Sequence, residues 1–183
     1  MMGLLILKYL LLWASIMIKP EPIYLVPLIE QKAEKYKLSR ELVLAVIETE
    51  SEGFIYASRY EPNFYEQYLQ GRPLYGPNKL PGDNPKDVII EEEFYTRASS
   101  LGLMQVMLQT AREMGYQGYA HDFFKPEVNL EYGCKYLASR IKLKRGNIRL
   151  GLLAYNGGGD VKYPDRVFRN LEKVKALNFF RAK

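Results

Sequence analysis

Apolar residues recur at helical spacing between residues 41 and 52, and one acid falls among them. At roughly 100° per residue, a helix here gathers four apolar side chains into one stripe: Leu42, Val43, Val46 and Ile47. Glu50 lies near the centre of that stripe, whereas three other acids share the opposite, solvated face: Glu41, Glu48 and Glu52. An inward carboxyl group is costly to ionise, so its pKa should rise toward the range that suits a general acid. A structural acid paired with an Arg or Lys is the alternative.

Apolar spacing predicts helices over most of the remaining chain. Ser39 is a good N-cap for the helix that carries Glu50, and Gly53 is a good stop. The other predicted helices cover residues 23–36, 103–114, 129–144, 148–156 and 164–177. We therefore expect a mainly α fold with five or six helices.

Residues 54–98 break the helical pattern. This stretch is rich in tyrosine and carries five prolines, with turn-forming glycines and asparagines between them. The composition predicts a long irregular insertion, with a short helix around residues 63–69 and a strand-like segment at residues 88–90. We expect the acidic run that follows, Glu91 to Glu93, to be solvated.

The chain begins with an apolar segment. Residues 2–18 are apolar apart from Lys8 and a few small or aromatic members, and Lys19 and Pro20 follow them. This length is at the lower limit for a helix that spans a membrane. No clean small-x-small cleavage site follows, and no basic residue precedes Lys8. We expect residues 1–20 to be an export signal or membrane anchor, with a packed N-terminal helix as the alternative, and residues 21–183 to be the folded domain.

Composition narrows the class of protein. With 183 residues, 48% hydrophobic and 26% charged, the chain suits one globular domain. A net charge of +5 suits a polyanionic partner such as a cell wall or a membrane surface, and equally promotes solubility. No basic run interleaved with aromatic residues indicates nucleic-acid binding. Cys134 lies on an apolar stripe, and His121 has no second His or Cys at ligand spacing, so we expect neither a metal nor a cofactor.

Four short strings occur in an order that resembles a known family. They are Glu50-Ser51, then Gly102-Leu103-Met104-Gln105, then Ala154-Tyr155-Asn156, then Tyr163-Pro164 with Val167. This order is similar to that of the soluble lytic transglycosylase domain, which belongs with the goose-type lysozymes. The resemblance covers roughly residues 38–174 apart from residues 54–98, a stretch that is longer here than is usual in the family. It implies a lysozyme-like helical lobe with a substrate groove.

The resemblance also implies roles for individual residues. Glu50 matches the family's single catalytic acid, and Ser51 matches a neighbour that orders the site. Met104 and Gln105 match residues that line the sugar groove. Tyr155 matches a tyrosine whose hydroxyl lies close to the acid, Asn156 follows it as a groove residue, and Tyr163 matches a residue that closes the far side. Ser99 and Ser100 stand where the family usually has Gly-Ala, and we expect one of their hydroxyls to contact Glu50.

The activity implied is cleavage of the β-1,4 bond between N-acetylmuramic acid and N-acetylglucosamine in peptidoglycan, with a 1,6-anhydro product. Its partners would be peptidoglycan glycan strands, and the protein would be a monomer. It would act at the cell envelope, or on the host wall if a phage encodes it. The first alternative is a hydrolytic lysozyme, which needs a second carboxylate. The available acids for that role are Glu61, Glu91, Glu92, Glu93 and Asp122. The second alternative is a wall-binding module without catalysis.

Overall fold

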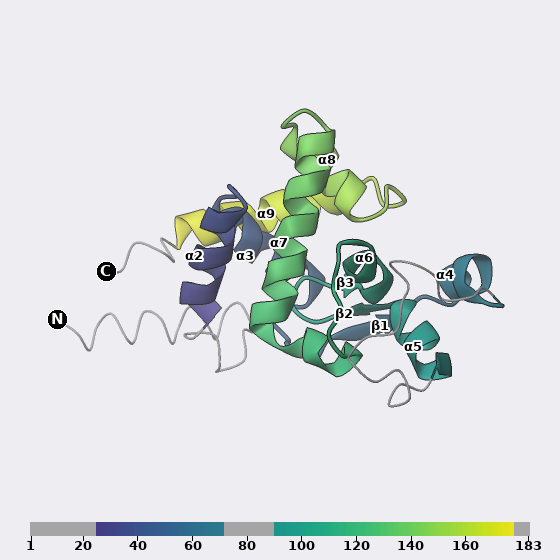
Figure 1. Cartoon of the computed structure of the whole chain (residues 1–183). Coiled ribbons are helices and arrows are strands. Elements are labelled where there is room, and N and C mark those ends of the chain that lie inside the picture. Colours follow the sequence, from purple (N-terminus) through teal and green to yellow (C-terminus); the bar gives the residue numbers. More distant parts are fainter. Residues whose placement is uncertain (1–24, 72–89, 178–183) are drawn as a thin grey trace.

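The computed structural model describes residues 25–71 and 90–177, and helices dominate this part of the chain (Figure 1). The longer helices are α2 (Leu25–Lys35), α3 (Arg40–Glu50), α5 (Ile90–Arg97), α6 (Leu108–Glu113), α7 (Pro126–Leu143), α8 (Ile148–Tyr155) and α9 (Tyr163–Ala176). Short helical turns are α4 (Pro62–Phe64), a π-helical turn η2 (Tyr65–Leu69) and a 3₁₀ turn η5 (Ala120–Phe124). The mainly α prediction is confirmed.

Helix α3 lies at the centre of the core, between α2 and α9. Its N-cap is Ser39, as predicted, whose side chain accepts a hydrogen bond from the backbone N–H of Leu42. Six consecutive residues, 42–47, are buried, so no broad solvated face remains. The prediction that Glu48 lies on such a face is wrong. Its side chain is partly buried, and its Oε1 atom has no hydrogen-bond partner among the described residues.

A small antiparallel sheet stands beside the helices, in the order β1 (Ser58–Tyr60), β2 (Ser99–Leu101), β3 (Val106–Met107). Ser100 pairs with Arg59 on one side and with Met107 on the other. A tight turn over residues 102–105 joins β2 to β3. The predicted helix over 103–114 is therefore wrong over residues 103–107, and α6 begins only at Leu108. The backbone explains this difference, because Gly102 and Gln105 have φ angles of +71° and +44°, which no α-helix accommodates.

The described parts of the 54–98 stretch are more regular than we expected. Residues 62–69 are helical, in agreement with the short helix predicted there. Of the predicted strand at 88–90, only Ile90 lies within the described residues, and it begins helix α5. Glu93 is 3% exposed, which corrects the expectation of a solvated acidic run. It is buried because α5 packs on α6. Arg97 of α5 and Arg112 of α6 both donate to its Oε1, at 2.7 and 2.9 Å.

Two further predictions concern the ends and the single cysteine. The apolar segment at residues 2–18 and the boundary near residue 20 lie outside the described residues. Within residues 25–71 and 90–177, no helix has the length and apolarity needed to cross a membrane. Cys134 is fully buried in the core, in agreement with its place on an apolar stripe.

Candidate functional site

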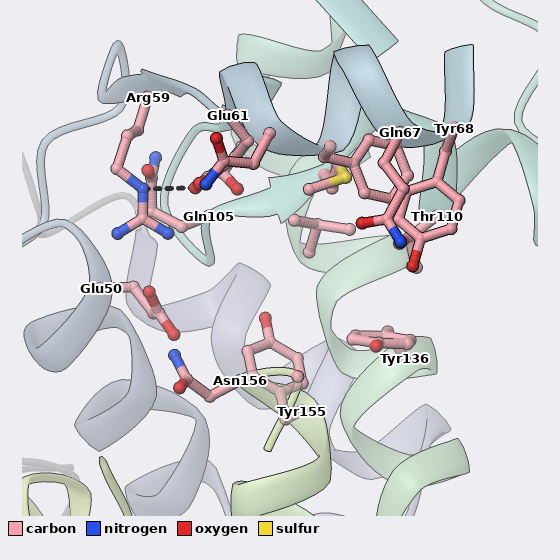
Figure 2. Close-up of a pocket in the computed structure, with 16 residues that line it drawn as sticks. Glu50, Arg59, Glu61, Gln67, Tyr68, Gln105, Thr110, Tyr136, Tyr155 and Asn156 are labelled. Carbon is pink, nitrogen blue, oxygen red and sulfur yellow. Dashed lines mark hydrogen bonds and ion pairs between the residues drawn. The ribbon is translucent and has the colours of Figure 1, made fainter. Parts of the chain in front are cut away.

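A cleft of about 490 Å³ opens between the sheet, the 58–68 segment and the ends of α3 and α8 (Figure 2). Glu50, Asn156 and Tyr155 lie on one side of it in this view, and Arg59, Glu61 and Gln105 lie on the other. The lining residues come from segments that are far apart in the sequence: Glu50, Arg59, Glu61, Asn63, Phe64, Gln67, Tyr68, Ser100, Gln105, Val106, Met107, Thr110, Tyr136, Tyr155, Asn156 and Gly157. Five of the nine residues that the sequence nominates are therefore brought to one cleft: Glu50, Ser100, Gln105, Tyr155 and Asn156.

Glu50 is the last residue of α3, so its side chain leaves the helix where the helix meets the cleft. Ser51 is the C-cap, and its hydroxyl donates to the carbonyl of Leu103 at 2.7 Å. This bond ties the end of the acid-bearing helix to the turn over residues 102–105. Ser51 does not line the cleft, and this bond is its link to the site.

The carboxyl group of Glu50 is held by one short hydrogen bond. The hydroxyl of Tyr163 donates to its Oε1 at 2.6 Å. Burial raises the pKa of Glu50 to about 7, although the bond from Tyr163 and the charges of Arg59 and Arg166 favour the ionised form. Near neutral pH this carboxyl group therefore exists in both its protonated and its ionised form. Such a group can both give and accept a proton near pH 7.

Tyr163 reaches Glu50 from the first residue of α9, where Pro164 occupies the first turn. It is 1% exposed, and burial raises the pKa of its hydroxyl above the ordinary value, so it stays protonated as a donor. The family resemblance implied that Tyr163 closes the far side of the groove and that Tyr155 lies beside the acid. The structure gives Tyr163 the direct hydrogen bond to the acid. Tyr155 also lies near the acid, since burial and, after it, the charge of Glu50 raise the pKa of its hydroxyl.

Tyr155 donates its hydroxyl to the backbone carbonyl of Met104 at 2.6 Å. Its side chain is buried, and its ring edge contributes to the cleft wall near Tyr136. Met104 itself is 0% exposed and packs against Gly133 and Cys134 on α7, where its Sδ lies 4.0 Å from the cysteine Sγ. We expected Met104 to line the sugar groove. The structure places its side chain in the core, because the turn over residues 102–105 points it toward α7, and only its carbonyl serves the site.

Asn129, which the sequence analysis did not nominate, holds that turn in place. It is 0% exposed, and its side chain accepts from the N–H of Met104 at 2.9 Å. Its amide also donates to the carbonyls of Leu101 and Phe123, at 2.8 and 3.2 Å. A Cβ atom at Gly102 would lie 2.4 Å from this amide, so glycine is required there for space as well as for its positive φ. The sequence feature that could have identified Asn129 is its place as a polar residue at the start of an apolar helical stripe.

Of the remaining nominated residues, Gln105, Asn156 and Ser100 line the cleft, whereas Ser99 does not. Gln105 lines the cleft, and its amide donates to the carbonyls of Ala57 and Gly102, both at 2.9 Å. Asn156 caps α8, and in Figure 2 its side chain points toward Glu50. Ser100 lines the cleft but has no hydrogen bond to Glu50 within the described residues. Ser99 does not line it, because its hydroxyl bonds the carbonyl of Tyr95.

The long insertion supplies one wall of the cleft, and of its lining residues only Glu61 was nominated from the sequence, as a candidate second carboxylate. Six lining residues come from this segment: Arg59, Glu61, Asn63, Phe64, Gln67 and Tyr68. Arg59 donates to Glu61 at 2.6 Å, and the rings of Phe64 and Tyr68 lie 4.9 Å apart. Glu61 is therefore the second carboxylate among the residues that line the cleft. Of the other acids considered, Glu92 is exposed, Glu93 is buried in ion pairs, and Asp122 pairs with Lys125 at 2.7 Å.

Comparison with known proteins gives a match to one family model, whereas no solved structure matches the chain. A family model described as Transglycosylase SLT domain matches residues 27–175, which include every cleft residue named above.

Proposed function

Since that match covers most of the chain, the protein belongs to the transglycosylase SLT domain family, and we propose that Glu50 cleaves peptidoglycan with a 1,6-anhydro product. At the family level the chain is a lytic transglycosylase that acts on peptidoglycan. The bond we propose for cleavage is the β-1,4 bond between N-acetylmuramic acid and N-acetylglucosamine. The observation that carries the proposal is the carboxyl group of Glu50, which is partly buried in the cleft, accepts a hydrogen bond from Tyr163 and has a pKa raised by burial.

In the first step, protonated Glu50 gives its proton to the glycosidic oxygen as the C1–O bond breaks. The muramic acid ring takes on oxocarbenium character, which its own N-acetyl group can stabilise, so no nucleophile from the protein is needed. Glu50 becomes a carboxylate in this step. The hydrogen bond from Tyr163 and the nearby charges of Arg59 and Arg166 stabilise that carboxylate, since all three favour the ionised form.

In the second step, the Glu50 carboxylate removes the proton from the C6 hydroxyl of the same sugar. The freed oxygen attacks C1 and closes the 1,6-anhydro ring, while Glu50 regains its proton. One carboxyl group thus acts as acid and then as base, which requires a pKa near the working pH. Gln105 and Asn156, at the cleft surface, are suited to hydrogen-bond sugar hydroxyl and acetamido groups.

A hydrolytic lysozyme is the second candidate function, and the position of Glu61 favours it. An inverting hydrolase needs a carboxylate that activates water opposite the acid. Glu61 lies across the cleft from Glu50 in Figure 2. Against this role, Glu61 accepts a charged hydrogen bond from Arg59 at 2.6 Å, which occupies one of its oxygens and weakens it as a base.

Digestion of purified peptidoglycan separates the two candidates. We expect muropeptides that are lighter by one water than hydrolytic products, because ring closure replaces the attack of water. We also expect Glu61→Gln to change the rate but not the kind of product. Mass spectrometry of the digests checks both points. Reducing-end products from the wild type, lost in Glu61→Gln, would establish the hydrolase instead.

The proposed substrate sets the place of action. A protein that cuts glycan strands works at the cell envelope of its own cell or, if a phage encodes it, on the wall of the host. That it acts as a monomer stays a prediction. A role for residues 2–18 in export or anchoring stays a prediction.

A further inference from the structure

The turn between α7 and α8 carries an exposed surface that the catalytic cleft does not use. Nine consecutive residues, 142–150, are exposed, and we call them the α7–α8 tip. Three of them are large aliphatic residues: Leu143 is 63% exposed, Ile148 42% and Leu150 45%. Figure 1 shows this end of the two helices projecting beyond the rest of the described fold. An exposed group of aliphatic side chains of this kind marks an interaction surface.

All charged residues that neighbour these aliphatic residues in the sequence are positive. No Asp or Glu occurs between Glu131 and Asp160. The tip holds four cations, Lys142, Lys144, Arg145 and Arg149, and Arg140 precedes it on α7. Arg149 pairs with Asp165 of α9, whereas Lys142, Lys144 and Arg145 have no ion pair within residues 25–71 and 90–177. The tip therefore presents a local excess of positive charge.

The tip contributes little to the packing of the two helices. Close contact between α7 and α8 occurs at Gly151, where an added Cβ would lie 2.5 Å from the Ile141 side chain. Beyond that point, every residue of the turn is exposed. These three side chains add little to the core because they are exposed, which leaves Leu143, Ile148 and Leu150 available for contact with a partner.

We propose that the α7–α8 tip docks on the surface of an anionic phospholipid bilayer. The cations suit the phosphate and other anionic headgroups, each contributing attraction near the surface. The aliphatic side chains suit the boundary between headgroups and acyl chains, which a soluble polyanion does not offer. A second copy of the chain fits poorly, because it would bring like charges together at the tip.

Docking through the tip would place the cleft near the membrane. Helix α8 begins at the tip with Ile148 and ends at the cleft with Tyr155, a length of about 10 Å at 1.5 Å per residue. The cleft would then lie beyond the far end of α8 from the bilayer surface. Glycan strands that lie next to the membrane would be the substrates within reach.

Sedimentation with vesicles tests the docking proposal on the full chain. We expect the wild type to bind vesicles of phosphatidylcholine plus phosphatidylglycerol more strongly than vesicles of phosphatidylcholine alone. The double variant K144E/R145E should lower partition into the anionic vesicles by roughly tenfold or more. The double variant L143S/I148S should lower it several-fold, because less apolar surface enters the interface. Residues 2–18 are the same in every variant, so the differences report the tip.

A matched control changes charge elsewhere by the same amount. Lys37 and Lys125 are exposed, and Lys125 lies at the opposite end of α7, so K37E/K125E should bind anionic vesicles much as the wild type does. Cleavage of soluble glycan fragments should be unchanged in the tip variants, which shows that they are folded. Equal binding by the wild type and K144E/R145E would overturn the proposal. The proposal would also be overturned if L143S/I148S bound polyphosphate and anionic vesicles as tightly as the wild type does. The tip would then be a site for any polyanion.

Discussion

Glu50→Gln is expected to reduce cleavage of purified peptidoglycan by roughly 10³-fold, within the range that a lost general acid and base produces. The amide has nearly the shape of the carboxyl group, and its oxygen can still accept the hydrogen bond from Tyr163. It cannot deliver a proton to the glycosidic oxygen. Release of soluble muropeptides, followed by chromatography, measures the loss, and binding of the variant to intact peptidoglycan should persist.

Glu48→Gln is the matched control for this variant. Glu48 lies on the same helix two residues earlier, and burial raises its pKa to about 7 as well. It does not line the cleft, so we expect its amide variant to keep wild-type activity. If Glu50→Gln clears the wall as fast as the wild type, the protein only binds the wall. If Glu48→Gln is as inactive as Glu50→Gln, the loss comes from a disturbed helix α3 and not from the missing acid.

Asn129→Ala is expected to lower the free energy of unfolding by about 3 kcal/mol, because it leaves buried polar groups of three residues without partners. The groups are the N–H of Met104 and the carbonyls of Leu101 and Phe123. Activity should fall as well, since the turn over residues 102–105 positions Gln105 and, through Ser51, the end of α3. Denaturant unfolding followed by circular dichroism measures the stability.

Asn147→Ala provides the same substitution at an exposed site. Asn147 caps α8 with one hydrogen bond to the N–H of Leu150 at 3.0 Å, so the expected loss is about 1 kcal/mol. Its activity should match that of the wild type. Equal losses of stability in the two variants would mean that Asn129 does not hold the turn as the hydrogen bonds imply.

Helical periodicity predicted much of this fold, because the core is built from helices with regular apolar spacing. The helices predicted over 23–36, 129–144, 148–156 and 164–177 agree with α2, α7, α8 and α9 within a few residues. The place of Glu50 at the inner side of its helix was also predictable, since the position of a side chain around a helix follows from its number. The end of this helix near Gly53 was also predictable, because glycine readily adopts the positive φ that the backbone has there.

The rest depends on contacts between segments that are far apart in the sequence. Tyr155 and Tyr163 are both buried, and only the packing of α9 against α3 decides that Tyr163 reaches the acid. Glu48 looked solvated because a single helix does not reveal that neighbours cover it on more than one side. Met104 looked helical because its spacing fits a stripe, whereas the positive φ of Gln105 ends that register.

The insertion was the least predictable part of the site. Its prolines and tyrosines indicated irregular structure, and nothing in their spacing indicated that residues 59–68 would form a wall of the cleft. Strand β1 brings Arg59 beside Ser100, and the turn that follows carries Glu61 to the cleft. A pairing of this kind between strands of three residues leaves little trace in sequence periodicity.

The most direct test of the central claim is a ¹³C NMR titration of the glutamate side-chain carboxyl groups. The resonance of Glu50 is identified as the one that disappears in Glu50→Gln, which also separates it from Glu48. We predict a titration midpoint near 7 for Glu50, because burial outweighs the hydrogen bond and the positive charges around it. A midpoint at the ordinary value of about 4.5 would contradict the account, because the carboxyl group would then hold too little proton at neutral pH to act as the acid.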